Sequence, residues 1–441
     1  LNMPIHITGT GSFIPKNKVR NNSFFDKVFF DKDGNGYANS NEEIIEKFQT
    51  ITGIQERRYA NKEHKTSDLA TFASIEAIKD AGIDKESIDR AVVQVIELSQ
   101  SSNPDKCHDI AESQSPQIFS CGRSEADLNI MYDSLAEFNQ FTKDIFPKII
   151  LEAAILDFTK TKTLVANSNG VSFEVNKGLY GFSPMFTAKD GTDTSSFNYT
   201  GFYSRNIDKP LHKYGMIEQL LRETEQQVKT SPIQGKFIGD IIVTPDCIGD
   251  FLSMVESHIS DFMIISGRSV YKDKLNESIA SPKLTLHSHP LSEKLDYNYF
   301  TTGDGYACKN STIIDRGVLK TLLLGIYGSN KTGRDRAVNN GGAHIVEPGD
   351  KALDDMISTI DRGILLSRFS GGSPSDNGDF SGVAKNSYYI ENGKIKYPIS
   401  ETMISGNICK MLYDIQDISK ETINDGSSIY PWIQFSDLTI S

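Results

Sequence analysis

The C-terminal half of the chain alternates short apolar runs with tight-turn signals, and this pattern limits the fold more than any other feature. Asp315-Arg-Gly and Asn392-Gly393 each lie between two apolar runs. Turns of this composition connect antiparallel strands, because they accept the positive φ that hairpins need. We therefore expect a mostly β domain from about Gly235 onward.

One helix is expected inside that domain. Asp350 can cap its N-terminus, and Gly363 can end it. Its buried stripe recurs at helical spacing and consists of Leu353, Met356, Ile357 and Ile360.

The preceding part of the chain mixes helical and strand patterns. Residues 138–159 and 216–230 have helical periodicity. Between them, residues 164–201 are β-rich, with turns at Asn169-Gly170 and Asp190-Gly191. This pattern predicts a middle α/β domain.

The N-terminal segment alternates strands and helices. Strands are expected at 5–14 and 91–96, and helices at 43–51, ended by Gly53, and at 67–80. Residues 97–127 are rich in Ser, Asn, Asp and Pro, which is typical of a linker. The predicted fold class is α+β, with an α/β segment at 1–94, a linker at 95–127, a middle domain at 128–234 and a C-terminal domain at 235–441.

Composition excludes several classes of protein. A net charge of −12 and a pI near 5.2 argue against a nucleic-acid groove. No apolar run approaches membrane-span length, and the first residues lack the pattern of a signal peptide. The five scattered cysteines form no CxxC pair, which favours free thiols. We expect a soluble cytoplasmic protein.

A glycine-rich stretch is the first candidate site. The glycines at 371, 372, 378 and 382 can adopt positive φ and let another backbone come close, which suits a peptide-binding or subunit-contact rim. The alternative is a plain surface connection between strands. The candidate contact residues are Arg268, Gly371, Gly372, Ser373, Asn377 and Asp379.

Residues 126–441 resemble the TldE/PmbA family of bacterial TldD/TldE peptidases, also called modulators of DNA gyrase. The main block is Asp361-Arg-Gly-Ile-Leu-Leu-Ser-Arg-Phe-Ser-Gly-Gly-Ser-Pro-Ser-Asp-Asn-Gly-Asp-Phe-Ser-Gly. Supporting blocks are Ser266-Gly-Arg-Ser, Ile314-Asp-Arg-Gly-Val-Leu, Glu347-Pro-Gly-Asp, Ala384-Lys-Asn-Ser-Tyr-Tyr, Ile404-Ser-Gly-Asn, Leu128–Leu135 and Ala166-Asn-Ser-Asn-Gly-Val-Ser. Several ordered blocks make the match specific.

The resemblance implies a subunit without its own metal. In the TldD partner family a helix carries His-Glu-x-x-x-His, which binds zinc. The corresponding stretch here is Leu252-Ser-Met-Val-Glu-Ser257, and leucine cannot ligate a metal. The resemblance thus implies a non-catalytic subunit with no cofactor of its own. Its expected partners are a TldD-like metallopeptidase subunit, in a heterodimer, and unfolded or leader peptides. A homodimer is a further expectation.

Residues 4–93 resemble a different family, the N-terminal part of ketoacyl-ACP synthase III. The residues that carry this resemblance are Ile7-Thr-Gly-Thr-Gly-Ser-Phe-Ile-Pro15, Thr52-Gly-Ile54, Glu56-Arg-Arg-Tyr-Ala60 and Asp80-Ala-Gly-Ile-Asp84. The resemblance makes an acyltransferase an alternative function. Its Cys-His-Asn set cannot be assembled here, although Cys121 is a conceivable nucleophile. A half-synthase alone would expose a sheet edge and an uncovered core face.

A calcium-loop pattern occurs within that segment. Residues 31–42 fit the EF-hand template, with Asp31, Asp33, Asn35, Tyr37, Asn39 and Glu42 as the candidate oxygen ligands. Ala38 stands where an apolar residue normally pairs with a second hand, and no second loop follows. A solvated turn is the alternative interpretation.

The remaining histidines offer a third function, a stand-alone peptidase with an unfamiliar site. His258, His287, His289 and Cys308 are the residues that could supply one. Their spacing follows no known metal or nucleophile pattern.

Overall fold

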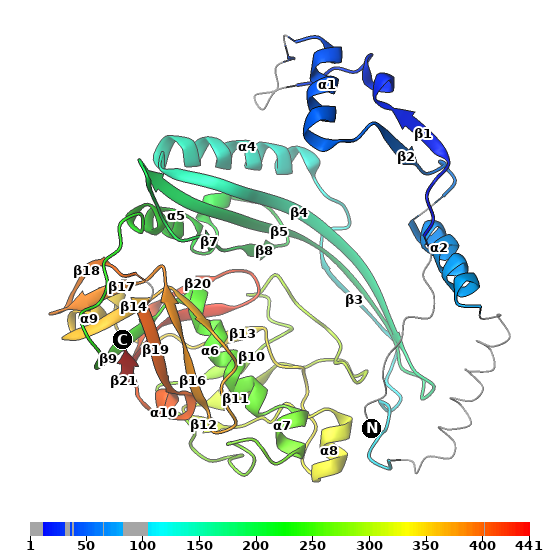
Figure 1. Cartoon of the computed structure of the whole chain (residues 1–441). Helices are drawn as coiled ribbons and strands as arrows, with labels where there is room; N and C mark the ends of the chain where they lie inside the picture. Colours follow the sequence, from blue (N-terminus) through cyan, green and yellow to red (C-terminus); the bar gives the residue numbers. More distant parts are fainter. Residues whose placement is uncertain (1–11, 31–35, 38, 65, 83–104, 401) are drawn as a thin grey trace. The chain divides into compact units, whose positions relative to one another are not determined.

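The computed structural model describes residues 12–30, 36–37, 39–64, 66–82, 105–400 and 402–441 (Figure 1). They form two compact units, residues 1–104 and 105–441. Each unit is described by itself below.

The first unit consists of short elements around a small apolar centre. They are β1 (Asn17–Arg20), η1 (Asn21–Phe24), α1 (Asn41–Thr52), β2 (Glu56–Tyr59) and α2 (Thr66–Asp80). β1 and β2 pair antiparallel. Ser40 caps α1 by accepting a hydrogen bond from the Glu43 amide, and Gly53 ends it at a φ of 68°. Both helices expected in this segment are therefore confirmed.

Apolar side chains of this unit are largely exposed. Ile45 is buried, whereas Val28 is 69% exposed and Ile51 70% exposed. The strand expected at 91–96 and most of the one at 5–14 lie outside the described residues. The same is true of the calcium candidates Asp31, Asp33 and Asn35. Of the remaining three, Tyr37 and Asn39 are exposed, and Glu42 lies in the first turn of α1.

The second unit begins with a layer built on two very long strands. Its strands are β3 (Gln117–Gly122), β4 (Ile149–Ala166), β5 (Ser172–Asp190), β6 (Asp193–Thr194), β7 (Asn198–Tyr199) and β8 (Phe202–Ser204). β5 pairs antiparallel with β4 and parallel with β3, and β6, β7 and β8 also pair with β5. α4 (Leu128–Ile145) runs alongside β4 and β5 (Figure 1), and η2 (Leu211–Lys213) and α5 (Ile217–Gln226) complete the layer.

The helix expected at 138–159 is wrong in its second half. The chain leaves α4 at Phe146, passes Pro147 and enters β4. Proline removes a backbone donor, and the β-branched Ile149 and Ile150 favour the extended backbone that pairs with β5. Long-range strand pairing thus overrides the helical periodicity of this stretch.

The C-terminal part forms a 13-stranded mixed sheet. Its strands are β9 (Phe237–Val243), β10 (Leu286–Ser288), β11 (Ser311–Asp315), β12 (Val318–Leu319), β13 (His344–Val346), β14 (Arg362–Leu366), β15 (Arg368–Gly371), β16 (Asp379–Lys385), β17 (Tyr388–Glu391), β18 (Lys394–Pro398), β19 (Thr402–Asn407), β20 (Ile415–Asn424) and β21 (Ile429–Ile440). Its helices are α6 (Pro245–His258), α7 (Asp261–Ile265), α8 (Ile326–Thr332), α9 (Leu353–Ser358) and α10 (Ile408–Tyr413).

Both predicted hairpin turns are confirmed. Arg316 and Gly317 have φ values of 44° and 81° between β11 and β12, and Asn392 and Gly393 have 50° and 69° between β17 and β18. Two successive positive φ values match the right-handed twist of a hairpin.

The helix expected over 350–363 is shorter than predicted. α9 spans Leu353–Ser358 and is preceded by Ala352, without a side-chain cap. Gly363 lies inside β14, where it faces Asp240 of β9. An added Cβ there would stand 2.2 Å from the Asp240 carbonyl oxygen, so this glycine permits close strand pairing rather than ending a helix.

Two large apolar cores and one small cluster organise this unit, whose fold class is α+β. The first packs α6 against the C-terminal sheet, with Phe251 and Val255 at its centre. The second joins the two layers, because Phe182 of β5, Leu220 of α5 and Trp432 of β21 belong to one cluster. The long strands are therefore fixed to the C-terminal sheet.

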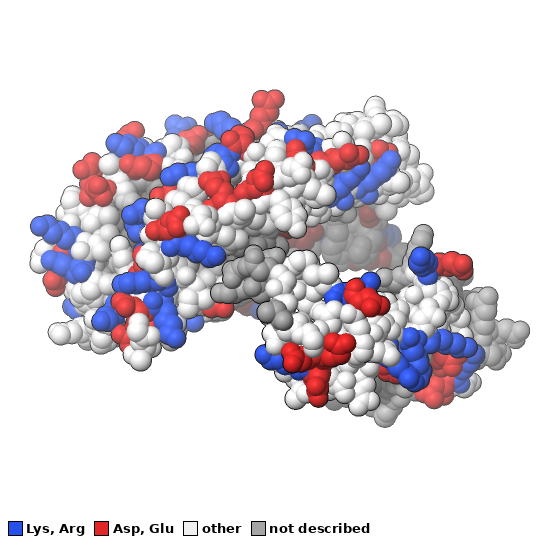
Figure 2. Space-filling model, turned by 90° about the horizontal axis from the view of Figure 1, so that it is seen from above, with Lys and Arg blue, Asp and Glu red and all other residues white. Residues whose placement is uncertain are grey.

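The surface carries charges of both signs. Lys and Arg side chains are interspersed with Asp and Glu over the face seen in Figure 2. Among the described residues, no helix is long and apolar enough to cross a membrane.

Candidate peptide and subunit-contact site

The glycine-rich candidate stretch runs from the end of β15 through a loop into β16. The backbone amides of Ser375 and Gly378 close the loop on the carbonyls of Asp379 and Ser375, at 2.9 and 2.8 Å. Asn407, the capping residue of α10, donates from Nδ2 to the carbonyl of Asn377 and to Oδ1 of Asp379. The loop is therefore held in one shape by its own residues and by α10.

The glycines of this stretch serve different purposes. Gly378 alone among the four has a positive φ, at 89°. Gly371 and Gly382 are paired across β15 and β16. A Cβ on either one would stand 2.4 or 2.5 Å from the Phe369 ring. These two glycines thus make room for an aromatic ring, while Gly372 faces open space.

Arg268 connects this loop to the segment after α7. Its Nε and Nη2 donate to Oδ2 and Oδ1 of Asp376 at 2.6 and 2.7 Å, in a two-pronged pair. The hydrogen bond from Arg268 lowers the pKa of Asp376. The guanidinium also lies 5.7 Å from the ring centroid of the exposed Phe262. Both charged side chains are about half exposed, so the pair stands at the surface.

The predicted contact residues therefore gather around one exposed loop. Asn377 donates to Asp379 at 2.8 Å, and hydrogen bonds from Asn407 and Asn377 lower the pKa of Asp379. Arg268 reaches the same loop through Asp376. The side chain of Ser373 is exposed. This arrangement presents amide, carboxylate and guanidinium groups that can hydrogen-bond a backbone or a partner surface.

Helix α6 occupies the place where the resemblance puts the metal-binding helix. Leu252 is 1% exposed and belongs to the core of the C-terminal sheet, and Ser257 faces solvent. Glu256 accepts a hydrogen bond from the Gly342 amide at 2.9 Å. Its Oε1 also lies 2.7 Å from Nε2 of His344. Glu256 thus holds the loop that leads into β13.

The Glu256–His344 pair continues to a third residue that sequence reasoning missed. Nδ1 of His344 lies 2.6 Å from the hydroxyl of Tyr430, which is buried. Burial raises the pKa of Tyr430 far above its usual value. The three residues come from α6, β13 and β21, so only the assembled sheet brings them together.

The other candidate histidines do not form one metal-binding group with Cys308. His258 is buried at the end of α6, and burial lowers its pKa. The rings of His287 and His289 stack with centroids 4.5 Å apart. His287 is held between Thr312, at 2.9 Å, and Glu347, at 3.2 Å. Burial raises the pKa of the Cys308 thiol to about 12. Within the described ranges, no group of three or more His, Cys, Asp or Glu side chains could hold a metal ion.

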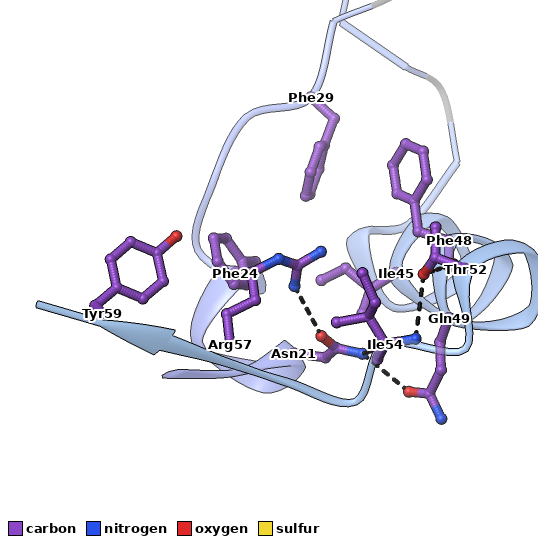
Figure 3. A pocket seen from close by; sticks show the side chains of 10 residues that line it. All are labelled: Asn21, Phe24, Phe29, Ile45, Phe48, Gln49, Thr52, Ile54, Arg57 and Tyr59. Atoms are coloured by element: carbon purple, nitrogen blue, oxygen red, sulfur yellow. Dashed lines mark hydrogen bonds between the residues drawn. The ribbon is translucent and has the colours of Figure 1, made fainter. Parts of the chain in front are cut away.

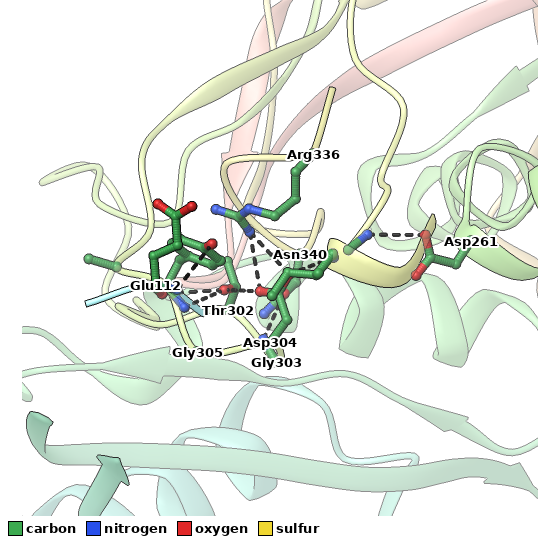
Figure 4. Close-up of polar contacts among 12 residues, drawn as sticks. Glu112, Asp261, Thr302, Gly303, Asp304, Gly305, Arg336 and Asn340 are labelled. Atoms are coloured by element: carbon green, nitrogen blue, oxygen red, sulfur yellow. Dashed lines mark hydrogen bonds and ion pairs between the residues drawn. The ribbon is translucent and has the colours of Figure 1, made fainter. Parts of the chain in front are cut away.

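A second polar cluster surrounds Asp304 (Figure 4). Thr302 donates to Asp304 at 2.5 Å, Arg336 pairs with it at 3.2 Å, and the Ile326 amide donates to it at 2.9 Å. Asp261 accepts from the Gly325 amide at 3.1 Å, and burial raises its pKa. Both carboxylates therefore hold the start of α8, which is a structural role.

Cys121, the nucleophile candidate of the alternative function, lies on β3 and is 8% exposed. Its Sγ faces the Asp296 carbonyl at 3.4 Å and Oδ1 of Asn298 at 3.6 Å. The Cys121 side chain is therefore packed between β3 and the 296–298 segment.

The first unit has a pocket of its own, of about 280 Å³ (Figure 3). Arg57 donates to Oδ1 of Asn21 at 3.1 Å and lies 5.4 Å from the centroid of Phe24. Asn21 donates to the Ile54 carbonyl at 2.8 Å. These contacts link η1 to β2 and the end of α1.

Comparison with known proteins identifies the C-terminal part directly. Residues 235–441 match the family model described as PmbA/TldA metallopeptidase C-terminal domain. A metalloprotease PmbA homolog of Buchnera aphidicola is 28% identical over 295 residues, which are 65% of this chain and 65% of the relative. Of two archaeal metalloproteases the chain matches 48% and 44%, so it spans less than two thirds of the length of these relatives.

Two solved structures share the fold. TldE from Thermococcus kodakarensis superposes with a TM-score of 0.69 at 19% identity, covering 81% of this chain and 86% of that one. A Bacteroides thetaiotaomicron protein described as a modulator of DNA gyrase also has a TM-score of 0.69, at 21% identity, covering 87% and 85%. Residues 235–441 therefore form a PmbA/TldA-type metallopeptidase C-terminal domain, and the chain as a whole is similar to a PmbA homolog and shares the fold of TldE.

Proposed function

We propose that the chain is the non-catalytic subunit of a TldD/TldE-type metallopeptidase and works in the cytoplasm. The observation that carries this proposal is the chemistry of α6. The resemblance aligns Leu252 and Ser257 with the two histidines of the TldD family, and the Leu252 side chain is buried in the core. A hydrocarbon side chain has no lone pair to offer a zinc ion.

In this proposal the zinc and the general base belong to a TldD-like partner, and this chain contributes contact surface. The exposed loop between β15 and β16, with the Arg268–Asp376 pair, supports such a role. Its hydrogen-bonding groups are held in place before any partner arrives, which lowers the entropic cost of association.

The test is to purify the full chain and measure bound zinc and peptide cleavage, first alone and then mixed with a TldD-type subunit. We expect zinc and chelator-sensitive cleavage in the co-eluting complex and neither in the isolated chain. One zinc per isolated chain with cleavage of unfolded peptide would overturn the proposal. Failure to co-elute with any TldD-type subunit would contradict the partnership.

The contact surface is tested by a matched pair of variants. Arg268→Ala removes the pair with Asp376 and the contact with Phe262. Arg222→Ala is the control, because Arg222 is similarly exposed, pairs with Glu218 at 3.4 Å and lies 5.7 Å from Phe146. We expect Arg268→Ala to weaken association at least tenfold and Arg222→Ala to leave it unchanged. Equal losses of affinity for the TldD-type subunit in the two variants would show that the loop is not part of the interface.

A further inference from the structure

We propose that a pocket of about 270 Å³ between β4, β5 and the 295–298 segment binds a short peptide through its two charged ends. The pocket is lined by Asp157, Thr159, Thr161, Lys177, Leu179, Gly181, Tyr203 and Tyr297. All of these residues belong to this chain, so peptide binding in this pocket needs no partner subunit. The proposed function does not include such a pocket.

The floor of the pocket is one face of the long β4–β5 pair. Thr161 lies opposite Lys177, and Asp157 lies opposite Gly181. Alternate residues of a strand point to the same face, so these side chains share that face with Thr159 and Leu179. A Cβ at Gly181 would stand 3.3 Å from Oδ2 of Asp157, so the glycine leaves the carboxylate end of the floor open.

Two tyrosines form the wall. The rings of Tyr203 and Tyr297 lie with centroids 4.5 Å apart. The turn between β20 and β21 holds both backbones, because the Tyr203 amide donates to the Asp425 carbonyl and the Tyr297 amide to the Gly426 carbonyl, each at 2.8 Å. The wall is therefore built where the two layers of the unit meet, and its position is set by one turn.

Lys177 supplies the positive end. Its Nζ lies 3.9 Å from the centroid of the Tyr297 ring, and the side chain is only partly exposed. Within the part of the chain that the structure describes, no carboxylate pairs with this ammonium and no hydrogen bond holds it. A half-buried ammonium over an aromatic ring, without an anion, is a ready site for a carboxylate.

Asp157 supplies the negative end. Its Oδ1 accepts one hydrogen bond from Thr159 at 3.2 Å, and no described cation pairs with it. Asp157 and Thr161, which is opposite Lys177, are four residues apart on β4, or about 13 Å. The flexible four-carbon side chain of Lys177 can reach along this face and shorten the gap between the two charges.

The size of the ligand follows from this spacing. An extended tripeptide spans about 10 Å, whereas a single amino acid is too short to reach both charges. The pocket volume is close to the lower limit of ligand pockets, roughly 300 Å³, which excludes a long folded ligand. The geometry therefore favours a free tripeptide, with its carboxylate on Lys177, its amine toward Asp157 and its side chains against the tyrosines.

The test measures binding of Ala-Ala-Ala to the full chain by calorimetry, beside its C-terminal amide, its N-acetyl form, free alanine and acetate. We expect the tripeptide to bind, and each end-blocked form to bind at least tenfold more weakly. Lys177→Met should bind the tripeptide at least tenfold more weakly and should bind the free tripeptide and its C-terminal amide equally. Lys162→Met is the matched control, because Lys162 lies on β4 next to Thr161 but pairs with Glu174 at 2.9 Å.

Several outcomes would overturn the inference. Equal affinity for Ala-Ala-Ala and its C-terminal amide would show that the peptide carboxylate is not recognised. Acetate or alanine binding as tightly as the tripeptide would show a general anion site instead. If Lys177→Met did not fold, as judged by circular dichroism, the comparison of free and blocked peptides on the unchanged chain would still decide. Cleavage by a TldD-type complex is a separate readout, so a failure here leaves the proposed function intact.

Discussion

The carboxylate of Glu256 on α6 lies 2.7 Å from Nε2 of His344 on β13, and the other ring nitrogen of this histidine lies 2.6 Å from the Tyr430 hydroxyl. The three side chains have little exposure, with His344 at 5% and Tyr430 at 8%. A polar chain of this kind links the helix to two strands of the sheet, and each member satisfies the hydrogen-bonding needs of the next.

We expect His344→Ala to destabilise the C-terminal domain by about 2–4 kcal/mol, because it leaves the buried Tyr430 hydroxyl without its partner and the partly buried Glu256 carboxylate with only the Gly342 amide. Trp432 is the one tryptophan of the chain and lies in β21, so its fluorescence during urea unfolding reports on this domain. Ser257→Ala, on the exposed side of α6, is the control and should stay within about 0.5 kcal/mol. A loss below that value for His344→Ala would contradict a structural role.

The Arg268–Asp376 pair should contribute little to stability, although it matters for the proposed contact. Both side chains are about half exposed, and surface ion pairs contribute roughly 0–1 kcal/mol. We therefore expect Asp376→Asn to shift the urea midpoint only slightly while it weakens association with a TldD-type subunit. A large loss of stability in Asp376→Asn would instead show that the Arg268–Asp376 pair stabilises the fold.

Gly426 should be essential for the tyrosine wall. It has a φ of 86°, and a Cβ there would stand 1.9 Å from the Tyr203 carbonyl oxygen. Gly426→Ala should therefore displace the turn and reduce tripeptide binding. Gly191→Ala is the matched control, since Gly191 has a φ of 62° but no atom within 4 Å of the added Cβ. An alanine at Gly191 introduces the same kind of backbone strain at positive φ, about 1 kcal/mol, but no steric clash. Equal tripeptide affinity of the two variants would show that a clash at Gly426 does not displace the tyrosine wall.

Glu223 on α5 should make stability fall as pH rises. Burial raises its pKa to about 7, although Gln219 donates to Oε1 at 2.7 Å, and Oε2 is buried without a described partner. Because the folded-state pKa lies above the unfolded value of about 4.3, the folded state holds the proton more tightly. The stabilisation is complete below about pH 4 and is lost as pH rises to about 7.

The Glu223→Gln variant checks this assignment. It should remove up to about 3 kcal/mol of the pH dependence between pH 4 and 8, as followed by urea unfolding. Glu225→Gln on the same helix is the control, because its side chain accepts a hydrogen bond from the Lys148 amide that glutamine can also accept. An unchanged pH profile in Glu223→Gln would show that another group titrates.

Local signals in the sequence were enough for several elements. Gly53 ends α1, and Asn392-Gly393 closes a hairpin, because helix ends and turns depend on the conformational preferences of a few adjacent residues. The ordered blocks between residues 126 and 441 identified the family, and the α+β class followed from the alternation of patterns. Helix ends and turns of this kind depend on adjacent residues and therefore do not require knowledge of the tertiary structure.

The sequence alone determined where the chain can turn, which residues are apolar and that Leu252 cannot bind zinc. Only the tertiary structure decided that residues 149–159 are a strand, because pairing with β5 outweighs their helical periodicity. It also decided that Gly371 and Gly382 face the Phe369 ring, that Glu256 meets His344, and that Lys177 meets Tyr297. These contacts join residues far apart in the chain, and their energies depend on packing and burial, which no local pattern encodes.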